Sequence, residues 1–342
     1  MSNKQTIIDN NARIEAITNR LNNSTFADVR DTTATAGDVA SGKIFYDKDG
    51  VRTEGAGTIS SGKDMLQARV DSNNSCYYLF YWYNGDNIDF IKDLDTSNVT
   101  IMNSMFQNCS KLTAIPLLDT SKVTDTGSMF KECIKLTTIP LLDTSNVTNA
   151  REMFYNCQAL TEIPQLDTSN VTNMYGIFQN CRAIITLPEL NTSKNTRMDY
   201  MFNGCGKLTT IPLLDMINAT NVSSVFNGCT NLTNLTLKNI KLELQIGSGT
   251  SWGHLLTLDS LINTIKELWD YSSGTSTRKL TMGTANLEKI ANTYVKLIDV
   301  TDEMIAQDAL IANKKPCVVC ESTDEGAMTI TEYALLKKWS LA

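Results

Sequence analysis

The chain has 342 residues, a formal net charge of −7 and a pI near 4.9, so it lacks the basic surface that a nucleic-acid-binding protein needs. No apolar run approaches the ~20 residues required to cross a membrane. The length allows either two compact domains or one elongated repeat domain with attachments.

Residues 1–24 are predicted to form a short helix that attaches or oligomerises the protein. Ile7, Ile14 and Leu21 lie at a heptad spacing, with Asn10 and Ile17 at the intervening seam positions. Isoleucine at both kinds of seam position favours a three-stranded coiled coil, so we expect a trimer. So short a helix is marginal in isolation, and the alternative is one amphipathic helix packed on its own protein.

Residues 25–62 are predicted to form a small β-hairpin module. Asp49-Gly50 is a hairpin signal between Ile44–Tyr46 and Val51–Thr53. The run ATAGDVASGKIFYDKDGVRTEGAGTI resembles a module that is common in phage tail and baseplate proteins. This resemblance implies that the N-terminal part attaches the chain to other tail or baseplate proteins.

Residues 63–93 are predicted to form a linker and the N-terminal cap of the next domain. The segment Ser60–Ser75 is rich in Gly, Ser and Asn at both ends, which is typical of a linker. The aromatic run CYYLFYWYNG follows it. We interpret this run as an atypical first coil that closes an open apolar end. The alternative is a platform on which sugar rings stack.

Residues 94–237 hold one 24-residue sequence six times, beginning with LDTSNVTIMNSMFQNCSKLTAIPL. Its Phe recurs at Phe106, Phe130, Phe154, Phe178, Phe202 and Phe226. Its Cys recurs at Cys109, Cys133, Cys157, Cys181, Cys205 and Cys229. A fixed period of this length predicts a solenoid of stacked coils.

Each copy is expected to be a short helical or irregular turn at Met-Phe-Cys followed by a short strand. The strand at Leu112–Ile115 would pair in parallel with Leu136–Ile139, about 4.8 Å away. Prolines would end these strands because they lack the N–H of a ladder: Pro116, Pro140, Pro164, Pro188 and Pro212. Asp-Thr-Ser marks a turn, since Asp accepts hydrogen bonds from amides ahead of it. The predicted fold class is an α/β-type repeat solenoid with a parallel β-ladder.

The pattern LDTSNVTxxxxMFxxCxxLTxIP resembles the BspA-type leucine-rich repeat of bacterial and phage surface proteins. This resemblance implies a curved, right-handed leucine-rich-repeat solenoid that binds without catalysis. The fifth copy departs from the pattern at Asn195, and the sixth at Met216 and Ile217. Residues 238–342 resemble the degenerate last coils and C-terminal cap of such proteins, where we expect Trp269 and Trp339 to pack.

The Cys and Asp residues of the repeat could in principle form a metal or catalytic site, but their regular recurrence is explained by structural roles. We therefore expect no catalytic residue, metal site or cofactor. The in-register cysteines would be held about 4.8 Å apart, too far for disulfides, and are expected to be buried thiols. Cys317 and Cys320 lack a second ligand pair, and their apolar spacing favours a core strand over a metal site. The Asp ladder offers paired carboxylates for glycoside hydrolysis, but it obeys the repeat, which favours turns.

Candidate binding residues stand at positions that the repeat leaves free, and they concentrate in copies three to five: Arg151, Tyr155, Tyr175, Arg182 and Tyr200. Tyr and Arg are enriched at binding hot spots. We expect Tyr175 and Tyr200 to be near neighbours on adjacent coils. The alternative is ordinary solvated surface.

These patterns predict a non-enzymatic phage receptor-binding or tail-fibre protein, located in the virion. It would attach through its N-terminus, trimerise through Ile7, Ile14, Ile17 and Leu21, and bind a bacterial surface glycan or protein. The alternatives are a cell-surface adhesin and a tail-borne glycan depolymerase. The start MSNKQTIIDNN lacks the apolar region of a signal peptide, which disfavours the adhesin. We expect neither nucleic-acid binding nor membrane insertion.

Overall fold

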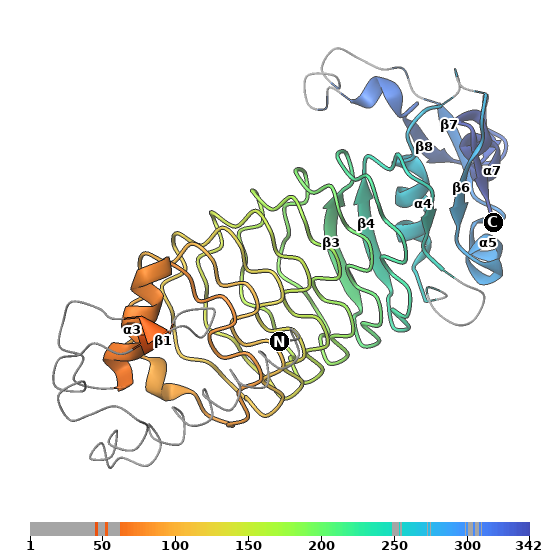
Figure 1. The fold of residues 1–342 in the computed structure, drawn as a ribbon. Coiled ribbons are helices and arrows are strands. Elements are labelled where there is room, and N and C mark those ends of the chain that lie inside the picture. Colours follow the sequence, from red (N-terminus) through yellow and green to blue (C-terminus); the bar gives the residue numbers. More distant parts are fainter. Residues whose placement is uncertain are drawn as a thin grey trace, which may run out of the picture.

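The computed structural model describes residues 45–46, 52–53 and 62–342, except 248–252, 254, 272, 274, 298, 300–303, 305–307 and 309. The helix predicted over residues 1–24, which carries Ile7, Ile14, Ile17 and Leu21, lies outside the described residues. In the predicted hairpin module, strand β1 (Phe45–Tyr46) pairs antiparallel with strand β2 (Arg52–Thr53). From residue 74 onward the chain winds as a stack of coils, with helix α3 at one end and the C-terminal helices and strands at the other (Figure 1).

The linker predicted at Ser60–Ser75 is wrong, because helix α3 occupies Gly62–Asn73. Leu66 and Val70, one turn apart, are buried and belong to the same apolar core as the coils. The Gln67 side chain donates to the Asp95 carbonyl over 2.8 Å and accepts from the Asp95 amide over 2.7 Å. These contacts hold α3 against the first coils. The Gly, Ser and Asn residues at the ends of the segment indicated a linker, but the residues between them form a helix with one apolar edge.

Backbone hydrogen bonds join the coils, and most of them lie in the Met-Phe-Cys segment. Four amides of the first copy donate to carbonyls of the second copy over 2.8–2.9 Å: Met102 to Asp125, Ser104 to Gly127, Phe106 to Met129 and Asn108 to Lys131. The amides between them donate within their own coil, as Met105 does to the Met102 carbonyl. Parallel bridges continue this ladder through Ile101, Asp125, Asn149, Asn173, Arg197 and Asn221.

Two residues in each copy take a left-handed conformation, and this makes the alternation of hydrogen bonds possible. In the first copy they are Ser104, with φ of 57°, and Asn108, with φ of 64°. The chain therefore turns sharply twice and directs every second amide along the stack. Gly176 and Gly204 occupy the equivalent positions in later copies, which suits a residue without a Cβ.

The predicted location of the β-ladder is therefore wrong. Leu112–Ile115 and Leu136–Ile139 form no strand, and the Thr137 amide bonds to the Thr113 carbonyl over 3.0 Å. Regular parallel pairing in this part of the repeat is confined, among the described residues, to β3 (Thr210–Asp215) and β4 (Asn234–Lys238). Pro212 lies inside β3 instead of ending it. The register shifts between Ile211 and Leu214, where Pro212 can donate no bond.

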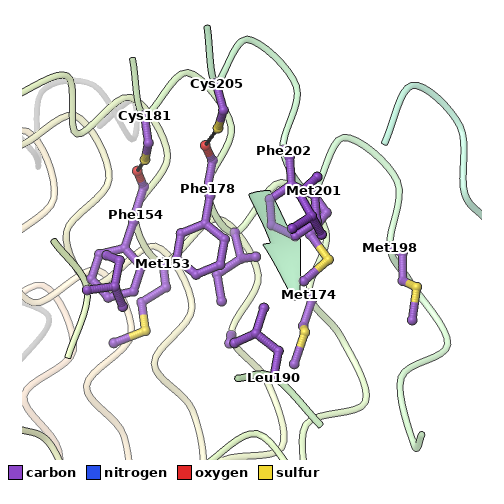
Figure 2. Packing of buried hydrophobic residues seen from close by; sticks show 14 of the residues in the cluster. Met153, Phe154, Met174, Phe178, Cys181, Leu190, Met198, Met201, Phe202 and Cys205 are labelled. Atoms are coloured by element: carbon purple, nitrogen blue, oxygen red, sulfur yellow. Dashed lines mark hydrogen bonds between the residues drawn. The ribbon is translucent and has the colours of Figure 1, made fainter. Parts of the chain in front are cut away.

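The core is a row of identical side chains from successive coils (Figure 2). Neighbouring Phe rings lie 5.6–6.2 Å apart between centroids and within 9° of parallel, from Phe80 to Phe226. Each ladder Cys is buried and free, and its thiol donates to a Phe carbonyl of the preceding coil, as Cys181 does to Phe154 over 3.0 Å. Burial raises the pKa of Cys205 to about 12. The cysteines are core residues with one polar contact each.

The aromatic run is a coil of the same kind, placed before the first copy. Phe80 stacks on Phe106 with centroids 5.7 Å apart, and the Cys76 amide donates to the Ile101 carbonyl over 2.8 Å. Tyr78 and Trp82 take the left-handed conformation of Ser104 and Asn108. The run YYLFYWY therefore superimposes on NSMFQNC with an offset of 26 residues instead of 24. We call residues 76–83 the aromatic coil.

The predicted Asp-Thr-Ser turns are confirmed. The Asp95 carboxylate accepts from the Ser97 amide over 2.9 Å, and the same contact recurs in all six copies, with Asn191 in the fifth. Hydrogen bonds from Ser121 lower the pKa of Asp119, and those from Ser145 lower the pKa of Asp143. Since Ile217 supplies the amide in the sixth copy, the turn does not need the Ser side chain.

One core position breaks the pattern. Val99, Val123, Val147 and Val171 are buried in copies one to four, and Asn195 takes their place in copy five. Asn195 has an exposed fraction of 0%, and neither its side-chain oxygen nor its side-chain nitrogen has a hydrogen-bond partner. This amide is a local defect in an otherwise apolar stack.

The C-terminal part closes the other end of the stack with two small sheets. Helix α4 (Leu258–Lys266) follows β5 (Leu244–Gln245), which pairs in parallel with β6 (Arg278–Thr281), and β6 pairs with β10 (Trp339–Leu341). The second sheet is antiparallel and contains β7 (Tyr294–Leu297), β8 (Cys317–Cys320) and β9 (Met328–Thr329). Other helices in the described part of the chain are η1 (Asp89–Ile91), α5 (Thr284–Ile290), η2 (Ile311–Asn313) and α7 (Ile330–Leu336).

Two buried side chains tie the last strand and helix to α4. The Trp339 indole donates to the Trp269 carbonyl over 2.8 Å. The Lys337 amino group donates to the carbonyls of Lys266 and Leu268, each over 2.8 Å, and so caps the C-terminus of α4. Burial lowers the pKa of Lys337 to about 7. The expectation that both tryptophans pack in the C-terminal cap is confirmed for Trp339, which is fully buried, whereas Trp269 is only half-buried and its ring centroid lies 4.1 Å from the Lys241 amino group.

Candidate functional site

One face of the stack is formed by residues that project away from the core beside the backbone ladder. We call it the ladder face, and it comprises the positions in register with Ile101, Asn103, Ser104, Gln107 and Asn108 of the first copy. Because the backbone ladder fixes these positions, each coil adds one row of side chains about 4.8 Å further along the axis. The composition of the face changes from copy to copy, whereas the Phe and Cys of the core recur in all six copies.

Tyr175 is the centre of a side-chain network on this face. Its ring centroid lies 5.7 Å from that of Tyr200, so the expected proximity of these residues is present in the structure. The guanidinium carbons of Arg151 and Arg197 lie 4.8 and 5.6 Å from the Tyr175 centroid. Such cation–π contacts hold both arginine side chains against the ring. Residues from three successive coils thus form one cluster.

The network continues into copies two and three through Glu152. The Lys131 amino group lies 2.8 Å from the Glu152 carboxylate and 4.7 Å from the centroid of the Tyr155 ring. The Arg151 Nε lies 3.8 Å from the same carboxylate. Tyr155, Arg151, Tyr175 and their partners therefore make a continuous patch that is partly exposed.

The charges of this patch are largely compensated. Asp199 accepts two hydrogen bonds from Arg197, each over 2.9 Å, and these bonds raise the pKa of Arg197. The Asp199 side chain is 3% exposed, whereas that of Arg197 is 47% exposed. Glu152 faces both Lys131 and Arg151. The patch consequently presents the faces of aromatic rings and hydrogen-bond donors that are already paired with carboxylates. It carries little net charge.

The sequence-predicted binding residues do not all come together. The patch contains four of them: Arg151, Tyr155, Tyr175 and Tyr200. Arg182, which follows Cys181, is exposed and makes none of the contacts described for the patch. Lys131, Glu152 and Asp199 stand at positions that the repeat leaves free but were not predicted as binding residues, and Arg197 was missed. Arg197 could have been found, because it breaks the register held by Asp125, Asn149 and Asn173.

The other candidate groups have structural roles in the described part of the chain. The Asp ladder accepts amide and hydroxyl hydrogen bonds from its own turns, as Asp119 does from Ser121. Cys317 and Cys320 form the ends of strand β8, as expected, but the strand is not fully in the core. Val318 and Val319 are exposed, and β8 lies at the edge of its sheet, paired with β7 alone.

No helix among the described residues combines the length and apolar character that a membrane span demands. Among these residues, no three His, Cys, Asp or Glu side chains gather as a metal-binding group.

Fold and site define a repeat protein that displays a variable face on a core built around a recurring Phe and Cys. The chain belongs to the family described as "Mycoplasma protein of unknown function, DUF285", whose model matches residues 74–186 and 161–246, half of the chain. The match begins at residue 74, so it includes the aromatic coil. The leucine-rich-repeat protein TpLRR of T. pallidum is similar over 45% of this chain and 70% of its own, with 18% identity and a TM-score of 0.31. Among curated proteins, none matches.

Proposed function

We propose that this protein is a non-enzymatic binding protein whose ladder face recognises a component of a bacterial surface. The observation that carries the proposal is the cluster of Arg151, Tyr175, Arg197 and Tyr200 from three adjacent coils. Tyr and Arg contribute most at binding hot spots, and here each is held in place by its neighbours. A pre-ordered patch loses little side-chain entropy on binding.

The proposed carrier is a phage tail or tail-like particle, on which the protein serves as a receptor-binding or tail-fibre component of the leucine-rich-repeat class. The run at residues 34–59, which resembles tail and baseplate modules, supports attachment through the N-terminus. Trimerisation through Ile7, Ile14, Ile17 and Leu21 would multiply the number of ladder faces and hence the avidity.

Adhesion to susceptible cells tests the binding role. The variant Tyr155→Gln/Tyr175→Asn/Tyr200→Ser replaces each tyrosine with a residue that another copy holds in register, so the coils should fold normally. The control is Leu141→Gln, a change outside the ladder face at a position where copy four has Gln165. We expect the triple variant to adhere at least about tenfold less, a loss of ~1.4 kcal/mol, and the control to adhere like the wild type. Equal adhesion of both variants would remove the ladder face of copies three to five as the site.

A second candidate is a cell-surface adhesin built from the same repeats. The two carriers differ in where the protein is found. Immunogold microscopy with an antibody to the coils should label the distal end of particles for the first proposal and the surface of the producing cell for the second.

A further inference from the structure

We propose that the outward half of the aromatic coil, comprising Tyr77, Tyr78, Tyr81 and Trp82, is a subsite for a neutral glycan chain that continues along the ladder face. The inference rests on the proposed function only for the far end of the ligand, at Tyr175. The subsite itself is carried by separate observations on the aromatic coil.

The four aromatic side chains form a cluster outside the buried core. Tyr77 is 49% exposed and Trp82 is 53% exposed, whereas Phe80 and Tyr83 of the same coil are buried and close the core. The ring centroids of Tyr77 and Tyr78 lie 4.1 Å apart, and those of Tyr78 and Tyr81 lie 4.7 Å apart. The inward residues thus fulfil the capping role, and the outward ones remain available.

Two of these aromatic residues have an unfavourable backbone conformation, which costs conformational free energy. Tyr78 and Trp82 have φ of 52° and 63°, in the left-handed region that disfavours bulky residues. The first copy places Ser104 and Asn108 at the same two positions. Aromatic residues retained in strained positions on a surface point to a binding role for their rings.

The cluster is continuous with the ladder face. The Tyr78 amide donates to the Asn103 carbonyl over 3.3 Å, and the Trp82 amide donates to the Gln107 carbonyl over 2.9 Å. The next row therefore presents the side-chain amides of Gln107 and Asn108, which can both donate and accept hydrogen bonds, while the Asn103 amide is bonded to Asp125 and Ser104. Beyond them the face leads to the Tyr175 ring, about four coils or ~19 Å from the aromatic coil.

This combination of groups fits a neutral glycan. Aromatic faces stack on the C–H faces of sugar rings, and side-chain amides pair with sugar hydroxyls. Lys131 is paired with Glu152 over 2.8 Å and Arg197 with Asp199 over 2.9 Å, and Arg151 lies 3.8 Å from Glu152, so an anionic polymer finds little uncompensated positive charge in the patch. The coil spacing of ~4.8 Å is also close to the length of one hexose in an extended chain.

The test uses the full chain and neutral oligosaccharides of glucose, galactose and N-acetylglucosamine, from dimers to octamers, measured by glycan array and calorimetry. We expect affinity to rise with length. The variant Tyr77→Asn/Tyr78→Ser/Tyr81→Gln/Trp82→Asn gives the aromatic coil the residues of the first copy and relieves the strain, so it should fold. It should bind the longest oligosaccharide at least about tenfold more weakly, while Leu141→Gln binds like the wild type.

The inference is overturned if no neutral oligosaccharide binds, if only anionic polymers bind, or if the aromatic-coil variant binds as the wild type does. It is also overturned if that variant merely abolishes self-association of the chain, measured by light scattering. The proposed function is assessed separately. Loss of cell adhesion in the Tyr155/Tyr175/Tyr200 variant without any glycan binding would leave the ladder face in place and remove the subsite.

Discussion

Replacing Asn195 with Val should stabilise the protein, because the fifth coil carries a buried amide without partners. Asn195 is fully buried, and its side-chain oxygen and nitrogen are both unpaired. A buried polar group left without a partner costs ~1–3 kcal/mol, so removing two such groups and filling the space with a branched apolar side chain should contribute about 2–4 kcal/mol. Copies one to four show that the coil accepts Val at this position, as at Val147.

Thermal and denaturant unfolding followed by circular dichroism measure this effect. We expect Asn195→Val to raise the melting temperature by about 4–10 °C. The matched control is Val147→Asn, which places the same amide two coils earlier and should lower the stability by a similar amount. If Asn195→Val had no effect while Val147→Asn destabilised the protein, the Asn195 amide would have a partner, and the reasoning from unpaired groups would be refuted.

Three further predictions follow from the core, the C-terminal end and the N-terminal helix. Alkylation of the native protein should label few of the six ladder cysteines, because they are buried and their thiols donate hydrogen bonds to backbone carbonyls, and unfolding should expose all of them. Disulfides between adjacent coils, found by non-reducing mass mapping, would contradict this. Burial lowers the pKa of Lys337 to about 7, so above pH 7 the unfolded chain binds more protons and stability rises with pH by up to ~1.4 kcal/mol per unit; between pH 7 and about 8.5 the Lys337→Met variant should lose this part of the rise, and parallel pH profiles would count against it. Deleting residues 1–22 should leave a folded, monomeric repeat domain by light scattering, and an unchanged oligomer mass would place the contact elsewhere.

The features that repeat could be predicted from the sequence. A residue that returns every 24 positions must meet the same environment in each coil, which accounts for the Phe row, the buried cysteines and the Asp turns. Counting the period was sufficient for these. The family resemblance adds the class of repeat and the expectation of binding.

The features that depend on backbone conformation could not be predicted in the same way. The inter-coil ladder lies where Ser104, Asn108 and Glu132 take positive φ, and nothing in the propensity of Glu indicates that conformation. The strand expected at Leu112–Ile115 rested on the Leu-Thr-x-Ile-Pro pattern, which does not specify the backbone conformation. The aromatic coil was harder to align because its offset is 26 residues, although Phe80 carries the signal.

The candidate site was only partly predictable for a related reason. Tyr175 and Tyr200 differ from exact register by one residue, and this could be counted along the chain. The contacts of Arg197 with Tyr175 and Asp199 join two different rows of the face. Such diagonal contacts depend on side-chain directions, which the period does not specify.

Covalent footprinting of tyrosines tests the central claim most directly, namely that the ladder face is the binding surface. The full chain would be labelled at tyrosine, free and bound to the envelope fraction of susceptible cells, and modification would be quantified by mass spectrometry. We predict that Tyr155, Tyr175 and Tyr200 are protected on binding, while Tyr294, which lies on β7 in the C-terminal sheet, is labelled equally in both states. Protection of Tyr294 with unchanged labelling of the three ladder-face tyrosines would contradict the account.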